Sequence, residues 1–296
     1  MKRAVTFFVM GILVCLIAVV SCNRDEFTVS EEEMNLVQAE NETIAEAVFQ
    51  QIEDQIDREI TLLETVNYLP GNLKSAELET CKPVVTVDTP EKSKFPKTII
   101  LDYGTGCTDA EGNFRAGKVM VHITGPYWEK NTIRTAKLVD YLFNDLKVKG
   151  ERKEINKGTN AKGYFLFEVD HSLTFTKADN GELICDRDWK RNREYDRGSD
   201  LKTNADDQVW VTGSASVDKH DVSMVKEITV KLYRRISCAH FMSGVITTII
   251  NKEKTATLDY GNEGECDEKA VWTNIKTGKT KVITLKHGVN WFSVKK

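Results

Sequence analysis

From about residue 81 onward, hydrophobicity alternates with a period of two, which is the strongest constraint on how this chain folds. Residues 118–123 read Lys-Val-Met-Val-His-Ile, and residues 227–232 read Glu-Ile-Thr-Val-Lys-Leu. Such alternation is typical of strands with one buried face. The pattern predicts strands near 83–87, 97–103, 117–124, 132–143, 162–177, 207–216, 225–237, 241–250, 254–260, 269–275 and 280–286. No helical pattern separates them, so we expect a mainly β (α+β) fold, an antiparallel meander or sandwich, over residues 81–296.

Residues 30–70 precede this region and carry a helical pattern over 30–66. Ser30 and the three glutamates after it form a capping box at the start of a helix. The apolar positions form one stripe, made of Val37, Ile44, Val48, Ile52, Ile56, Ile60 and Leu63. We expect an amphipathic helix that packs on the β-rich domain. A coiled-coil seam or a docking helix for an envelope protein is the alternative.

The strand-rich region contains an internal repeat. Residues 97–104 (KTIILDYG) and 254–261 (KTATLDYG) are identical at six of eight positions. Cys81 lies 16 residues before the first copy, and Cys238 lies 16 residues before the second. These shared offsets predict two related β-units, 81–125 and 238–288, within one fold.

The cysteine positions predict two disulfides. Cys238 and Cys266 are equidistant from a turn signal at residues 251–253, so they face each other across a hairpin, and Cys81 and Cys107 flank their own loop in the same way. Outside the cytoplasm we expect the pairs 81–107 and 238–266. Each would close a loop of roughly 25 residues and contribute about 3 kcal/mol. Two pairs of buried thiols are the alternative.

The first residues predict export and lipidation. Lys2 and Arg3 precede an apolar run, and residues 19–22 read Val-Val-Ser-Cys. A charged start, an apolar middle and a small residue before the cut are typical of a signal peptide over residues 1–21. The segment resembles a lipobox, although valine replaces the usual leucine three positions before Cys22. We expect lipid on Cys22. A plain membrane anchor is the alternative, for which an apolar run of about 17 residues is short.

Residues 22–29 form the predicted tether. Its Asn-Arg-Asp-Glu segment at 23–26 resembles the surface-export signal of lipoproteins in the Bacteroidetes, and an ordinary solvated tether is the alternative. Without the leader, 39 basic residues face 45 acidic ones. This balance gives no support to a nucleic-acid partner.

Longer segments carry a resemblance to an uncharacterised outer-membrane lipoprotein family of the Bacteroidetes with repeated Leu-Asp-Tyr-Gly…Cys motifs. The matching segments are 81–88 (CKPVVTVD), 95–107 (FPKTIILDYGTGC), 117–119, 123–125, 144–148, 211–215 and 258–261, spread over most of 81–296. The resemblance implies an outer-membrane address and a β-rich body. It brings no established activity for any residue.

No catalytic, metal or cofactor site is predicted. Ser223 and Lys226 sit at the spacing of a serine β-lactamase motif, but they lead into a strand that would place them on opposite faces. The five histidines lie one to a segment, without metal-ligand spacing. Residues 109–113 resemble part of a calcium loop, but a hairpin turn fits them better. We expect Cys185 to be a buried thiol, and Asp102 and Asp259 to form turns at strand ends.

Residues 186–197 (DRDWKRNREYDR) mix both charge signs and predict a solvated, mobile hairpin tip. Exposed aromatic residues suit sugars and peptides, so the candidate ligand contacts are Tyr127, Trp128, Trp189 and Tyr195. Completion of the core is the alternative, and it is favoured for Trp210 and Trp272.

These patterns predict a lipid-anchored binding or adhesion module, on the outer membrane and facing outward, whose ligand is an extracellular polymer or protein. The alternatives are a structural or accessory subunit of an envelope complex on the periplasmic side and, third, an enzyme.

Overall fold

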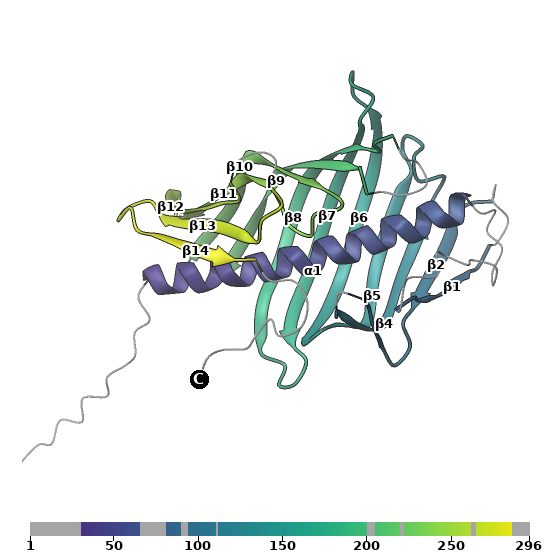
Figure 1. The fold of residues 1–296 in the computed structure, drawn as a ribbon, viewed down its shortest axis with the longest axis horizontal. Helices are drawn as coiled ribbons and strands as arrows, with labels where there is room; N and C mark the ends of the chain where they lie inside the picture. The colour runs from purple at the N-terminus through teal and green to yellow at the C-terminus, as the bar shows by residue number, and fades with distance from the viewer. Residues whose placement is uncertain are drawn as a thin grey trace, which may run out of the picture.

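One long helix crosses one large antiparallel sheet (Figure 1). The structure is a computed structural model that describes residues 31–65, 81–89, 94–110, 112–199, 205–219, 222–261 and 265–285. The sheet has 14 strands, and its neighbours follow the chain order from β1 to β14, except that the short β3 pairs only with β4. Every pairing is antiparallel. The predicted mainly β fold is therefore confirmed, and it is a meander.

The elements have the following bounds. They are α1 (Glu31–Thr65), β1 (Val84–Val87), β2 (Lys97–Asp102), β3 (Cys107–Thr108), β4 (Phe114–Ile123), β5 (Ile133–Phe143), β6 (Leu146–Thr159), β7 (Phe165–Lys177), β8 (Leu183–Asp196), β9 (Gln208–Lys219), β10 (Val222–Arg235), β11 (Ser243–Ile250), β12 (Glu253–Asp259), β13 (Lys269–Asn274) and β14 (Thr280–Thr284).

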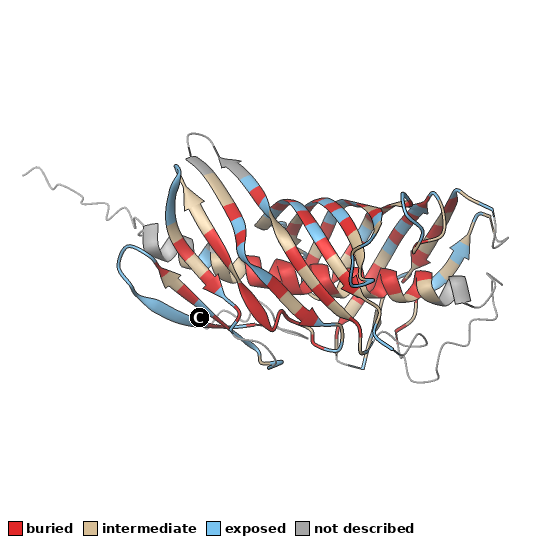
Figure 2. Ribbon diagram, turned by 90° about the horizontal axis from the view of Figure 1, so that it is seen from above, coloured by how far each residue is buried: buried red, intermediate tan, exposed pale blue. Residues whose placement is uncertain are grey.

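The sheet curves around α1, and the middle of the helix is buried (Figure 2). Ile44, Val48, Ile52, Ile56 and Ile60 of the predicted stripe are each at most 7% exposed and pack on the inner face of the sheet. Helix and strands thus share one hydrophobic core. Val37 at the start of the stripe is half exposed, and the side chain of Leu63 lies outside the described residues.

The two repeat units occupy opposite ends of the sheet, around β2 and β12. In each unit an aspartate closes the strand end: Asp102 accepts a hydrogen bond from the backbone N–H of Gly104, and Asp259 accepts one from Gly261, both at 2.8 Å. The tyrosine that follows each aspartate is buried in the core. The expected turn role of both aspartates is confirmed.

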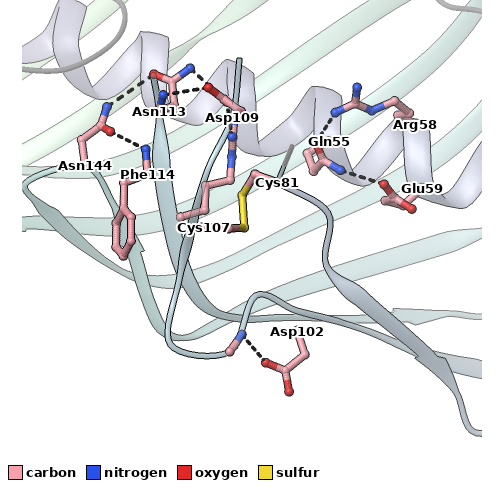
Figure 3. The surroundings of a disulfide bond; sticks show 12 residues. Gln55, Arg58, Glu59, Cys81, Asp102, Cys107, Asp109, Asn113, Phe114 and Asn144 are labelled. Carbon is pink, nitrogen blue, oxygen red and sulfur yellow. Dashed lines mark hydrogen bonds and ion pairs between the residues drawn. A yellow bond between two sulfur atoms is a disulfide. The ribbon is translucent and has the colours of Figure 1, made fainter. Parts of the chain in front are cut away.

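Both predicted disulfides are present: Cys81 is bonded to Cys107 and Cys238 to Cys266. Figure 3 shows the first of them beside the turn at Asp109. The Asp109 carboxylate accepts hydrogen bonds from the backbone and side chain of Asn113, at 2.7 and 3.1 Å. It also pairs with Arg115, so its oxygens serve a hairpin turn as expected.

Glycine within the long strands allows close approach between neighbours. Gly150 of β6 has φ +120°, and a Cβ there would lie 2.0 Å from the carbonyl oxygen of Ser172. Gly213 of β9 has φ +138°, and a Cβ would lie 2.2 Å from the carbonyl oxygen of Lys190. Only glycine fits both constraints, so these positions help the sheet to bend around the helix.

Two long strands lie where the sequence predicts none, apart from the two-residue strand β3. They are β6 (Leu146–Thr159) and β8 (Leu183–Asp196), near the middle of the sheet. The prediction of a mobile hairpin tip at 186–197 is therefore wrong. Eleven of these residues lie in β8, where ten pair with β7 on one side and eight pair with β9 on the other.

Residues 1–30, with the predicted signal peptide, the lipidation site Cys22 and the tether, lie outside the described residues. In the part of the chain that the structure describes, no helix is long and apolar enough to cross a membrane.

Candidate functional site

The inner face of the sheet carries a buried network of charged side chains beneath α1. Its helical members are Glu42, Glu46, Glu53, Asp54 and Asp57, and its sheet members are Arg134, Arg152, Glu154, Arg187, Arg191, Arg193, Lys226 and Arg234. The ion pairs run from β5 to β10. Helix and sheet are therefore joined by complementary charge as well as by apolar packing.

Strand β8 supplies the centre of this network. Arg187, Arg191 and Arg193 lie at odd positions and face inward, together with Trp189 and Tyr195, while the even positions face outward. This follows from the two-residue repeat of a strand, which sends alternate side chains to opposite faces. The mixed charges of this segment thus separate into a buried cationic face and an outer face of both signs.

Glu46 lies between two of these arginines. It accepts hydrogen bonds from Arg191 at 2.7 and 3.0 Å, and it also pairs with Arg187. Burial raises the pKa of Glu46, but Arg187 and Arg191 outweigh burial and hold this pKa well below its usual range. The carboxylate therefore stays ionised.

A second cluster surrounds Asp57. Arg193 pairs with Asp57 at 2.7 Å and with Glu154 at 3.2 Å, and Arg134 pairs with both acids as well. Burial raises the pKa of each acid, but the neighbouring arginines lower it by a larger amount. The net pKa of each acid is therefore below its usual value, and both acids stay charged. Tyr127 donates a hydrogen bond to Glu154 at 3.0 Å.

One residue of the inner face is neutral because of its surroundings. His171 is buried against Phe49 of α1, with ring centroids 4.3 Å apart. Burial, followed by the positive charges of Arg187 and Arg191, lowers the pKa of His171 well below its usual value. The ionisable groups of the inner face are buried between the sheet and α1, and most of them pair with each other. We therefore assign the inner face to binding α1.

The structure corrects the expected ligand contacts. Tyr127, Trp189 and Tyr195 are each at most 2% exposed, so they complete the core. Trp128 is partly buried, with the Arg197 guanidinium 4.4 Å from the centre of its ring. Trp189 packs on Arg191, and Tyr195 donates a hydrogen bond to Asp207. Tyr127, Trp189 and Tyr195 pack against buried arginines, so their rings are not accessible to a ligand on the outer face.

Three other aromatic residues form a row on the outer face. Tyr164 lies just before β7, Trp210 lies in β9 and Tyr233 in β10, and all three are half-buried. The Trp210 ring stacks with Tyr164 on one side and with Tyr233 on the other, with centroid distances of 5.3 Å in both cases. Trp272 is buried as expected, but the expectation that Trp210 completes the core is wrong.

A groove of about 310 Å³ lies beside this row. Its lining includes Trp210, Asn192, Thr212 and two ion pairs. Lys157 pairs with Glu168 at 3.1 Å, and Lys231 pairs with Glu194 at 2.9 Å. This groove combines apolar ring surface with hydrogen-bonding groups.

A second groove, of about 610 Å³, continues over the same strands. Its lining includes Ser172, Ser214 and Ser216, with charged side chains of both signs from β6, β7 and β8. From Trp210 to Ser216 the two grooves extend over about 20 Å of strand β9. We name the two grooves together the outer groove.

Sequence reasoning missed the outer groove because its residues are few and widely spaced. The signal available was the phase of the strands: Trp210 lies between the apolar residues Val209 and Val211, so it must face away from them. Cys185, which is the one cysteine outside the two disulfides in the described part of the chain, is unpaired and partly buried. Burial raises the pKa of its thiol to about 12, so it is not an activated nucleophile.

Among the residues that the structure describes, no three histidine, cysteine, aspartate or glutamate side chains are grouped to hold a metal ion. Comparisons with protein-family models, with curated proteins and with solved structures find no match to this chain.

Proposed function

We propose that this protein is an exported, lipid-anchored binding module that holds an extracellular polymer in the outer groove. The observation that carries the proposal is the aromatic row of Tyr164, Trp210 and Tyr233 on the face that α1 does not cover. Half-exposed aromatic rings are not needed for the core, and such surfaces mark binding sites.

The two faces of the sheet support a division of roles. The inner face is occupied by α1, with its carboxylates paired to arginines of the sheet. The outer face over β6–β10 carries the grooves and the aromatic row. A polymer that lies along the strands would contact both grooves at once.

The sequence features support an address at the cell surface. The leader over residues 1–21, Cys22 and the acidic tether agree with lipid anchoring and outward export, as does the resemblance to the lipoprotein family. Protease treatment of intact cells carrying an epitope near Lys296 tests this address. We expect loss of the epitope without lysis; protection until lysis would favour the periplasmic side.

The alternative, a subunit of an envelope complex that docks through the 30–66 helix, is weakened by the burial of the central stripe of α1. Among the helix side chains that the structure describes, Val37 is exposed and Glu40 is partly exposed, so a partner could contact this end. An enzyme is the third hypothesis.

The binding role is tested with the lipid-free protein that begins at residue 23, against a panel of immobilised polysaccharides and extracellular-matrix proteins. We expect at least one polymer to bind saturably, with Trp210→Ala weakening the binding. The matched control is Val271→Ala, which removes exposed apolar surface from β13, far from the groove in strand order. Equal weakening by both variants, or no binding by the parent protein, would contradict the proposal.

A further inference from the structure

We infer that the ligand of the outer groove is an uncharged polysaccharide. This inference rests on the proposed function and specifies its ligand. Sugar rings present C–H groups on their faces and hydroxyl groups at their edges, so they require flat apolar surface beside hydrogen-bonding groups. The half-buried Trp210, which lines the groove, provides apolar ring surface for the first requirement.

The polar lining provides the second requirement. The exposed Asn192 amide and the Thr212 hydroxyl lie in the groove with Trp210. The serines of the second groove add further hydroxyl groups. Each of these groups both donates and accepts hydrogen bonds, which matches the hydroxyl groups of a sugar.

The charges of the groove disfavour a charged ligand. Lys157 and Lys231, the lysines that line the aromatic part, are paired with Glu168 and Glu194, so this part has no surplus of either sign. The second groove is lined by Glu151, Asp170 and Asp188 against Lys153 and Lys190. A polyanion binds where lysines and arginines outnumber acids, and the second groove has three acids against two lysines.

The position of the groove also disfavours a peptide bound as an added strand. Such a peptide needs free backbone N–H and C=O groups at a sheet edge. Strands β7, β8 and β9 lie in the middle of the sheet, and each pairs with a neighbour on both sides. Only side chains face outward here, and a groove over about 20 Å of strand holds several sugar rings in a row.

The test is affinity electrophoresis of the lipid-free protein in gels that contain one polymer each. The neutral probes are glucomannan, xylan, dextran and a soluble β-glucan; the acidic probes are polygalacturonate and heparin; gelatin represents protein. We expect retardation by at least one neutral polysaccharide, and titration calorimetry then gives its affinity. Raising the salt from about 50 to about 500 mM should leave this affinity within about twofold, because no surplus charge takes part.

The variants locate the site. We expect Trp210→Ala to weaken binding about tenfold or more, since a central aromatic contact dominates such interfaces. Trp210→Phe keeps a ring and should retain most of the affinity, while Val271→Ala should bind as the parent does. Asn192→Ala should lower the affinity several fold by removing a hydrogen-bonding group. Because the Asn192 side chain is exposed, this variant should fold as the parent does.

The outcomes separate the inference from the proposed function. Binding of an acidic polymer or of gelatin alone, with dependence on Trp210, would overturn the neutral ligand and leave the binding role intact. Binding of a neutral polysaccharide that neither Trp210→Ala nor Asn192→Ala weakens would overturn the groove as its site. Failure to bind any polymer on this and the preceding panel would overturn both proposals.

Discussion

The pair Glu46→Gln and Glu40→Gln tests whether buried ion pairs hold α1 in place. Both residues are glutamates of the same helix, and both replacements keep the side-chain length and nearly the same helix propensity. Glu46 is buried between Arg187 and Arg191, whereas Glu40 pairs at 3.0 Å with Lys281 in a bridge whose two side chains are 41% and 51% exposed. The two variants therefore differ mainly in burial.

The expected losses differ by several kcal/mol. Glu46→Gln leaves the buried Arg191 without its counter-charge, while Arg187 keeps Glu42 at 3.1 Å. Breaking a buried pair in this way costs about 3–5 kcal/mol. Glu40→Gln removes an exposed pair that is worth about 0–1 kcal/mol. A domain is stable by only about 5–15 kcal/mol, so the first loss is a large fraction of the total.

Urea unfolding followed by far-UV circular dichroism measures both losses. The midpoint should fall strongly for Glu46→Gln and hardly for Glu40→Gln, with unchanged slopes that indicate the same exposed surface on unfolding. A loss below about 1 kcal/mol for Glu46→Gln would refute the reasoning, because it would mean that water or rearrangement compensates the arginines. Equal losses for the two variants would refute it as well.

Three further predictions follow from the same contacts. Stability should fall below about pH 6.5, because the unfolded chain then protonates His171 whereas the lowered pKa of His171 keeps it neutral in the folded chain. It should fall again below about pH 4.5, because the unfolded chain protonates Glu46 whereas the lowered pKa of Glu46 keeps it ionised in the folded chain. Urea midpoints measured from pH 8 to pH 3 check this, and a flat profile would contradict it. Alkylation of the unfolded segment from residue 31 onward should label one thiol, Cys185, without reductant and five thiols after reduction; more than one labelled thiol before reduction would exclude the pairings. Removing either disulfide should lower the free energy of unfolding by about 3 kcal/mol. Gly150→Ala should lower thermal stability more than Gly163→Ala, although both glycines have positive φ. An added Cβ at Gly150 would lie 2.0 Å from the Ser172 carbonyl oxygen, whereas one at Gly163 would meet nothing within 4 Å. Similar melting temperatures of the two variants would argue against close strand approach at Gly150.

The sequence was sufficient to predict strands whose inward positions are mostly apolar, and the amphipathic helix. Strand β4 and the stripe of α1 are of this kind, and the cysteine offsets predicted both disulfides because the repeat placed them symmetrically. Their signals are local periodicity and spacing, which do not depend on tertiary structure.

Strands β6 and β8 could not be found in this way because their buried positions are charged. The inward residues of β8 include Arg187, Arg191 and Arg193, and those of β6 include Arg152 and Glu154. Arginine at a buried position is normally excluded unless it is paired, and the partners lie on α1, about 100 or more residues away in sequence. The alternation was present, but its inward phase was polar, so hydrophobicity alone did not reveal it.

The spacing of the acids on α1 explains why charge is used at this interface. Ile44, Val48, Ile52, Ile56 and Ile60 recur every four residues, so a shift of the helix by about one turn would preserve much of the apolar packing. The paired acids at 42, 46, 53, 54 and 57 repeat in this way only in part. After a shift of four residues in one direction, Gln50, Arg58 and Thr61 would take the places of three acids; in the other direction, Gln38, Phe49 and Gln50 would.

We therefore infer that the apolar stripe stabilises the packing of α1 on the sheet and that the ion pairs select one register of the helix. Buried polar groups are known to select a register in other proteins. The double variant Glu46→Gln/Glu53→Gln removes two of the five paired acids while it leaves the stripe unchanged. It should dock α1 in more than one register, which doubles the NMR signals of helix residues such as Ala45 and Ala47. A single set of signals at their original positions would show that apolar shape alone fixes the register.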